Sequence, residues 1–416
     1  MKSLISLLLI PLLTLQAWSQ AALTLQECYE RAETNYPLIR QRELLEQTKN
    51  LSIENVLKGY LPQITIGGQG TYQSEVTQIP VEMPGVEPLS NDQYRIFGEV
   101  SQTLYHGGLV SQQRKMEEVN AAIEERKLAV DLYQLKNRIN ELFFGILFLQ
   151  AQTVQSELIK DDINAGLKRT EAAIANGTAI RSGADVLRAE LLRIEQRIIE
   201  MQSSENTYRE ILGIFIKAKV DETTLLQKPQ FNTAPSTISR PELALFDAQK
   251  QSIEINNALL SARRRPRMEL FVQGGYGRPG LNMLENSFNF YYLGGIRFSW
   301  LLSGYYTFRR EKEVLNLRQR SLDVQKETFL FNTGLTINQH DAEVAKLRRL
   351  IEVDDEIIAL RSRVRQTAEI QLEEGVITPT DFMREVNAED QAKQNLALHE
   401  TQLMMSQAKY QFASGQ

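Results

Sequence analysis

Apolar side chains recur every three or four residues along most of the chain, which is the period of a helix rather than of a strand. The clearest stretch lies between residues 109 and 176, and its stripe includes Ile139, Leu142, Phe143, Ile146 and Leu147. No proline occurs at 89–228 or at 280–378. Because a proline inside a helix costs about 3 kcal/mol, these tracts predict very long helices. A continuous helix over 109–176 would measure about 100 Å, which favours a coiled or tubular assembly over a compact globule.

Four short segments change to a period of two, with glycine and aromatic residues around them. They predict strands at about 62–74, 94–106, 267–277 and 288–302, arranged as two hairpins. Each strand has one apolar and one polar face, as a membrane barrel needs with lipid outside and water inside. The lipid-facing candidates are Ile64, Ile66, Val100, Leu270, Val272, Phe298 and Trp300. The alternative is a soluble sheet packed on helices, with its aromatic residues in the core.

Four strands are too few to close a barrel, since about eight is the smallest closed size. An open sheet edge cannot lie in lipid, because its backbone groups would lack hydrogen-bond partners. Membrane-spanning strands in this chain therefore predict that several copies share one barrel, and three copies would supply twelve strands. The long helices would then form a helical tube below the barrel.

The order of landmarks repeats along the chain. Matched pairs at an offset of 204 residues are Pro37 with Pro241, Pro62 with Pro266 and Gln69 with Gln273. Each half reads helix, strand, loop, strand, long helix, glycine break, helix. This order predicts two internal repeats at 20–217 and 240–416, joined by an aperiodic linker at 218–239.

The N-terminus predicts export. Lys2 precedes an apolar run from Leu4 to Leu15, and small residues follow at Ala17 and Ser19. This is the pattern of a signal peptide at 1–19, with a short membrane anchor as the alternative. Beyond residue 20, no apolar run approaches the roughly 18 residues of a membrane-spanning helix.

Composition argues against several kinds of chemistry. The net charge of −5 gives no reason to expect a nucleic-acid partner. A single cysteine, Cys28, excludes an internal disulfide framework and a cysteine-rich metal site. The three histidines lie far apart, and no carboxylate pair has a recognisable catalytic context. We therefore expect no enzymatic activity, no cofactor and no metal.

Several segments together resemble the TolC-like outer-membrane efflux family. They are LTLQECYERAETNYPLI at 23–39, Leu61-Pro62 before the first strand, TLYHGGL at 103–109 and EGVITPTDFMREVNAE at 374–389. The resemblance implies a mixed α+β membrane protein, built as a trimer with a shared twelve-stranded barrel and a periplasmic α-barrel about 100 Å long. It places the protein in the outer membrane of a Gram-negative bacterium, with most of its mass in the periplasm.

The resemblance also implies partners. The channel would be a passive duct of a tripartite efflux or type I secretion system, coupled through a periplasmic adaptor to an inner-membrane pump. The glycine breaks at 176–183 and 374–380 would be helix-hairpin tips that contact the adaptor, through Asn176, Gly177, Thr178, Glu374, Gly375 and Val376. A glycine at such a turn allows positive φ.

A closable constriction would follow the tips, with Asp185, Arg188, Asp381 and Arg384 as candidates. Some family members carry a second acid where this chain has Arg188 and Arg384, so a purely acidic ring is not implied. The alternative is that these four are ordinary solvated helix charges.

Two other classes of protein share some of these features. A soluble periplasmic coiled-coil adaptor or scaffold would also have a signal peptide and long helices. An exported enzyme is a third class, but the sequence offers no catalytic constellation. The four strands with alternating faces favour the channel, because an adaptor needs no lipid-facing hairpins.

Overall fold

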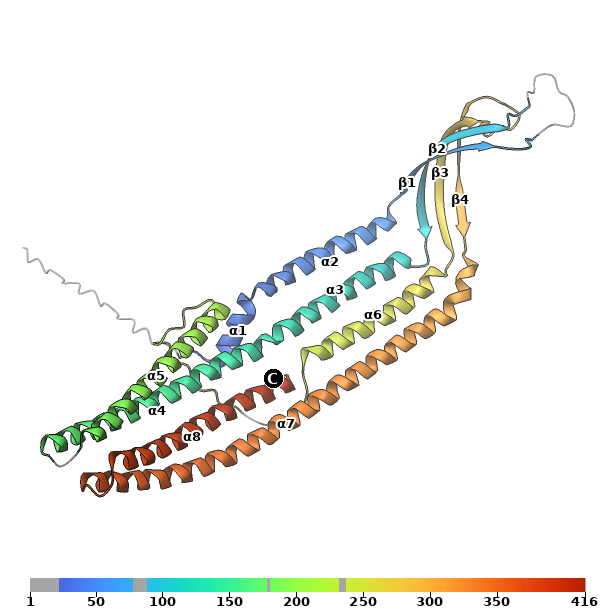
Figure 1. Cartoon of the computed structure of the whole chain (residues 1–416). Coiled ribbons are helices and arrows are strands. Elements are labelled where there is room, and N and C mark those ends of the chain that lie inside the picture. Colours follow the sequence, from blue (N-terminus) through green and yellow to red (C-terminus); the bar gives the residue numbers. More distant parts are fainter. Residues whose placement is uncertain (1–21, 78–87, 178–179, 232–236, 416) are drawn as a thin grey trace, which may run out of the picture. The chain divides into compact units, whose positions relative to one another are not determined.

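The computed structural model describes residues 22–77, 88–177, 180–231 and 237–415 (Figure 1). The predicted signal peptide at 1–19 lies outside these residues. The chain divides into two compact units. Unit 1 comprises Met1–Pro37, Tyr133–Ile238 and Leu335–Gln416, and unit 2 comprises Leu38–Leu132 and Ser239–Gly334. Each unit takes segments from both halves of the sequence, so the units cut across the predicted repeats, which stay a prediction.

Unit 2 contains a four-stranded antiparallel sheet in the order β1-β2-β3-β4. The strands are β1 (Gln63–Tyr72), β2 (Asp92–Tyr105), β3 (Arg267–Arg278) and β4 (Asn289–Ser299). The helices of this unit are α2 (Gln41–Leu57), most of α3 (Leu109–Tyr133), α6 (Pro241–Arg263) and the first part of α7 (Tyr305–Glu373). α2 leads into β1 and α7 follows β4, as Figure 1 shows, so each edge strand continues into a helix.

The last strand ends earlier than its expected range of 288–302. Trp300 lies one residue past β4, and its indole Nε1 donates to the carbonyl oxygen of Arg264 at 2.9 Å. A 3-10 turn at Leu302–Gly304 then leads into α7. The expectation that Trp300 is a strand residue is therefore wrong, because this hydrogen bond and the turn end the strand before it.

Close packing against aromatic rings explains two of the strand glycines. A Cβ atom on Gly67 would lie 2.6 Å from Cζ of Phe97 on the neighbouring strand. A Cβ atom on Gly275 would lie 2.6 Å from the Tyr291 ring. Because real Cβ atoms do not approach so closely, both positions need glycine for the aromatic ring to lie flat on the sheet.

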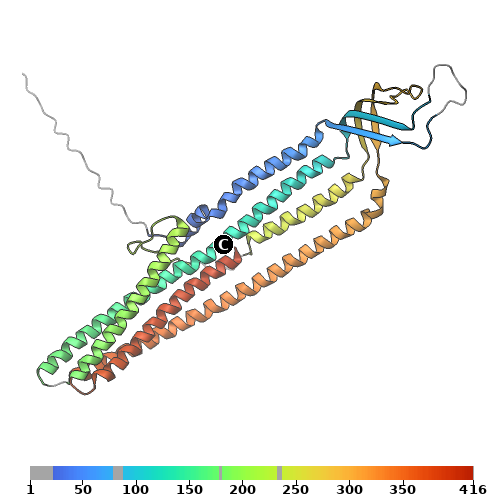
Figure 2. The same cartoon turned by 45° about the horizontal axis from the view of Figure 1, so that its top comes forward.

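Unit 1 is built from helices. They are α1 (Leu25–Asn35), α4 (Leu135–Ala175), α5 (Arg181–Ile216), the second part of α7, and α8 (Pro379–Ser414). Two hairpins, α4–α5 and α7–α8, run side by side in Figures 1 and 2. Cys28 of α1 is fully buried in the first core cluster, and burial raises the pKa of its thiol to about 12. The thiol is therefore unreactive at neutral pH.

The expected helix over 109–176 is interrupted once. The interruption falls at Gln134, where the amide of Asn137 bonds to the carbonyl of Gln134 in a tighter turn, and it coincides with the boundary between the units. Among the described residues, the tract 109–175 alone has the length and composition of a membrane-spanning helix, against our expectation of none. In its most apolar window, 39% of the residues are buried, and Phe143 and Ile146 belong to the first core cluster of unit 1. Burial in that cluster accounts for part of the apolar composition.

Lys217 is the single non-glycine residue with positive φ (47°) in the described part of the chain, and it terminates α5. Such a conformation costs an L residue about 1 kcal/mol. We predict that Lys217→Gly stabilises unit 1 by about 1 kcal/mol and raises the melting temperature of the detergent-purified protein by about 2 °C. Lys217→Ala removes the same side chain but keeps the unfavourable positive φ of an L residue, so it should not raise the melting temperature. Equal effects of the two variants would contradict this explanation.

Candidate functional site: the helix-hairpin tips and the two faces of the sheet

Both helix hairpins turn at a glycine with positive φ. Gly177 has φ of 73° and Gly375 has φ of 70°. At the second tip, the Gly375 amide bonds to the carbonyl of Leu372 at 3.1 Å, and the Val376 amide bonds to that of Gln371 at 2.8 Å. This is the Schellman arrangement, in which two carbonyls left over at the helix end find donors. No atom within 4 Å would meet a Cβ at either glycine, so conformation rather than space requires it.

The two helices that leave the tips begin differently. At the start of α8, Thr378 Oγ1 accepts from the Asp381 amide at 3.2 Å, and Asp381 Oδ2 accepts from the Thr378 amide at 3.3 Å. This capping box satisfies two amides, and Pro379 occupies the first helical position. At the start of α5, Ile180 provides no side-chain cap. The second tip is therefore better anchored than the first; Thr178 of the first tip lies outside the described residues.

The constriction candidates form pairs within their own hairpins. Arg188 bonds to Glu171 at 2.6 Å and lies 3.8 Å from Asp185. Arg384 lies 3.9 Å from Asp381, whose carboxylate is already engaged in the capping box. Among the described residues, no recorded contact joins the pair of the first hairpin to the pair of the second. All four side chains are exposed, so their role in a constriction stays a prediction.

The second core cluster holds the two hairpins together as one bundle. Phe382 of α8 is 1% exposed and lies against Gly166 of α4. Gly183 of α5 is buried, and a Cβ atom there would lie 3.0 Å from Cγ of Pro379. These contacts join α4 and α5 of the first hairpin to α8 of the second, close to both turns. They therefore hold the two tips side by side.

Two ion pairs of buried acids with half-buried arginines lie within the same bundle and were not predicted from the sequence. Glu389 of α8 lies 2.7 Å from Arg365 of α7, and it accepts a hydrogen bond from Ser362 at 2.6 Å. Burial alone would raise the pKa of Glu389, but the hydrogen bonds from Ser362 and Lys393 lower it below its usual value. Asp390 pairs with Arg197 of α5 at 3.0 Å. The signal was present, since both acids follow the apolar stripe of Phe382 and Val386 at helical spacing.

The sheet exposes its apolar face. The face carries Ile64, Ile66, Val100, Leu270, Val272 and Phe298, all of them exposed in the single chain, and Ile66 reaches 80%. Register places Ile64, Val100 and Val272 in one row across three strands. Nothing in the described chain covers this face, and the outer edges of β1 and β4 have no strand partner there. The single chain thus leaves both an apolar surface and two hydrogen-bonding edges unsatisfied.

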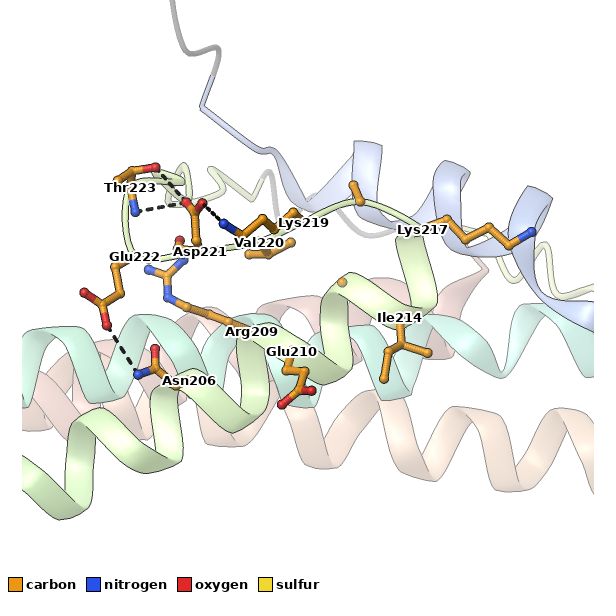
Figure 3. A pocket seen from close by; sticks show the side chains of 12 residues that line it. Asn206, Arg209, Glu210, Ile214, Lys217, Lys219, Val220, Asp221, Glu222 and Thr223 are labelled. Atoms are coloured by element: carbon orange, nitrogen blue, oxygen red, sulfur yellow. Dashed lines mark hydrogen bonds and ion pairs between the residues drawn. The ribbon is translucent and has the colours of Figure 1, made fainter.

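A cavity between the end of α5 and the start of the linker has a structural explanation (Figure 3). Its volume is about 760 Å³, between the end of α5 and residues 217–223. The Arg209 guanidinium is 2% exposed and donates to the carbonyls of Asp221 and Thr224 at 2.6 and 3.1 Å. Glu205 accepts from its Nε at 2.8 Å. Arg209 therefore ties the linker to α5, and among the described residues no cluster of ligands is placed to hold a metal.

Comparisons with known proteins agree on the fold. No protein-family model and no curated protein matches the sequence. Solved structures do match: the outer membrane protein VceC of Vibrio cholerae has 13% identity and a TM-score of 0.67, covering 94% of this chain and 96% of its own. The outer membrane channel CmeC of Campylobacter jejuni has 12% identity and a TM-score of 0.65, covering 94% and 85%.

A third match, the open state of the MtrE outer membrane channel of Neisseria gonorrhoeae, has 15% identity and a TM-score of 0.64, covering 94% of this chain and 88% of its own. The chain is therefore similar over nearly its whole length to outer-membrane channels. It has the TolC-like channel fold, mostly helical with a small antiparallel sheet, and the resemblance seen in the sequence is confirmed at the level of the fold.

The capping box gives a prediction for the second tip. Thr378→Ala removes a side-chain acceptor from the start of α8 and should cost about 1 kcal/mol. Amides of the first turn of α8 should then exchange with solvent about fivefold faster, as measured by hydrogen exchange. Ile180→Ala at the uncapped start of α5 is the matched control and should leave exchange there unchanged. Equal acceleration in the two helices would contradict the assigned cap.

Asp381 should make the same turn sensitive to acid. Hydrogen bonds from Thr378 lower the pKa of the Asp381 carboxyl, and Arg384 adds to this effect. A carboxyl with a lowered pKa in the folded state stabilises fully above its ordinary pKa of about 3.9 and loses this contribution as pH falls through the lowered value. The protection of these amides, which is the exchange rate of an unstructured amide at the same pH relative to theirs, should therefore fall below about pH 4 in the natural chain and stay constant in Asp381→Asn. An identical pH profile for both would exclude the carboxylate as the cause.

Proposed function

We propose that this protein is the outer-membrane channel of an efflux or type I secretion assembly, located in a Gram-negative outer membrane with most of its mass in the periplasm. The observation that carries the proposal is the four-stranded sheet, which has an exposed apolar face and two edges that pair with no other strand of the described chain. The apolar face is unfavourable in water, and the unpaired backbone groups of the two edges are unfavourable in lipid. Three copies that join β4 of one to β1 of the next satisfy both requirements in a barrel of twelve strands.

The helices next to the edge strands support this pairing. α2 exposes Leu44 and Leu51, seven residues apart, and α7 exposes Leu317, Val324 and Phe331 at the same spacing. Because α2 enters β1 and α7 leaves β4, joining the edges of two copies brings these stripes next to each other. A seven-residue apolar repeat is the spacing at which two helices interlock their side chains. The same contact between copies therefore extends from the barrel into the helices.

In this proposal the polar face of the sheet lines the pore, and the hairpin tips meet a periplasmic adaptor that connects the duct to an inner-membrane pump. Val376 is 70% exposed and Ile180 is 75% exposed, so each tip presents an apolar side chain that this chain leaves uncovered. The adaptor contact comprises Asn176, Gly177, Thr178, Glu374, Gly375 and Val376. The duct itself is passive and catalyses no reaction.

The alternative is a soluble periplasmic adaptor or scaffold. Such a protein has no use for six large apolar side chains exposed on one face of a sheet. Recovery of the protein from the periplasm without detergent would favour this alternative and exclude the channel.

The edge pairing can be tested by cross-linking, because the natural Cys28 is buried and does not interfere. We predict that Thr65→Cys in β1, combined with a cysteine at successive positions of β4, gives a covalent trimer at one or two positions when outer membranes are oxidised. A ring of three copies stops at trimer, whereas an open chain of copies would give a ladder. Each single-cysteine variant is the control and should stay monomeric in denaturing gels. Monomers at every β4 position would exclude the shared barrel.

A further inference from the structure

The charged side chains of the four strands do not cancel completely. The strands contain three acids and four bases, which are Asp92, Glu99 and Glu269 against Arg95, Arg267, Arg278 and Arg297. The sum over the four strands is therefore one positive charge per chain. Arg278 pairs with Asp92 at 2.5 Å, where β3 ends and β2 begins. The remaining charges all lie at odd-numbered positions, which alternate with the apolar face and so lie on the polar face.

One cluster on the polar face nearly balances itself. Arg297 of β4 lies 2.6 Å from Glu269 of β3 and 3.0 Å from Glu99 of β2, so its guanidinium crosses the intervening strand. The guanidinium carbon lies 4.3 Å from the centre of the Phe271 ring, which supports it. Arg267 is two residues from Glu269, about 7 Å along the strand, which is within the screening length at physiological salt. Solutes at this level of the sheet meet almost no net charge.

Arg95 differs because its partner is neutral. Its Nε and Nη2 atoms bond to Oε1 of Gln69 at 2.9 and 2.5 Å, and no acid of the strands contacts it. Glu99 is four residues away along β2, about 13 Å, which exceeds the screening length of about 8 Å. Arg95 therefore carries the one positive charge that the acids of the strands do not neutralise.

We propose that Arg95 determines the charge selectivity of the pore at the level of the strands, so that anionic solutes pass in preference to cationic ones. This inference rests on the proposed function, in which the polar face lines the pore. Every copy of the chain contributes one Arg95, so several such charges surround one lumen. A ring of like charge raises the local concentration of counter-ions.

The experiment replaces the charge and then restores it. Arg95→Cys is reconstituted in planar bilayers under a KCl gradient, and the reversal potential gives the permeability ratio of chloride to potassium. The natural chain should favour chloride, and the variant should lower the ratio by about twofold. A methanethiosulfonate reagent carrying trimethylammonium should return the ratio toward the natural value, and one carrying sulfonate should lower it further. Cys28 does not react, because it is fully buried.

Two controls separate charge from structure. Arg95→Lys keeps the charge and should keep the ratio, even if the bond to Gln69 changes. Tyr94→Cys is the neighbouring residue on the opposite face and should give a ratio that neither reagent alters. Open channels whose reversal potential ignores both reagents in Arg95→Cys would overturn the inference while leaving the channel intact. No conductance from the natural chain would instead overturn the proposed function.

Discussion

The requirement that every backbone amide and carbonyl of a strand find a partner governs this protein. A sheet of four strands satisfies that requirement internally except along the outer edges of β1 and β4. In water such edges can be hydrated, but the exposed Ile64, Ile66 and Phe298 disfavour water on one face. In lipid the face is favoured, but the edges must be closed. In the proposed assembly, association of copies through these edges resolves the conflict, and it would also align α2 with α7 and enclose a polar lumen.

Unit 1 is subject to a different constraint: two helix hairpins must each reverse direction, and their turns must stay together. Glycine provides the left-handed residue at each turn, and Phe382 and Gly183 provide contacts immediately behind them. The buried pairs of Glu389 with Arg365 and of Asp390 with Arg197 add specificity more than stability, since desolvating the charges offsets most of their attraction. A register shift of α8 would leave these charges buried without partners, so the pairs favour one alignment of the helices.

Local signals explain which features were predictable and which were not. Alternation of apolar and polar residues located four strands close to where the structure has them, because a strand with two different faces shows its period directly. The end of β4 was misplaced, because Trp300 continues the alternation although its side chain bonds to Arg264 from a distant segment. The capping box of Thr378 and Asp381 was also missed, although threonine followed three residues later by an acid is a known start signal.

The helices, strands and turns could be predicted from the sequence, because helical period, strand alternation and glycine turns depend on residues a few positions apart. The sequence also indicated that one chain has too few strands for a closed barrel. Which charges neutralise one another becomes visible only in the folded chain, since Arg297 and Glu99 are 198 residues apart in the sequence. Likewise, only folding brought Glu389 to Arg365 and Gly183 to Pro379. Such pairings depend on how helices and strands align after they form, and no short-range pattern encodes that alignment.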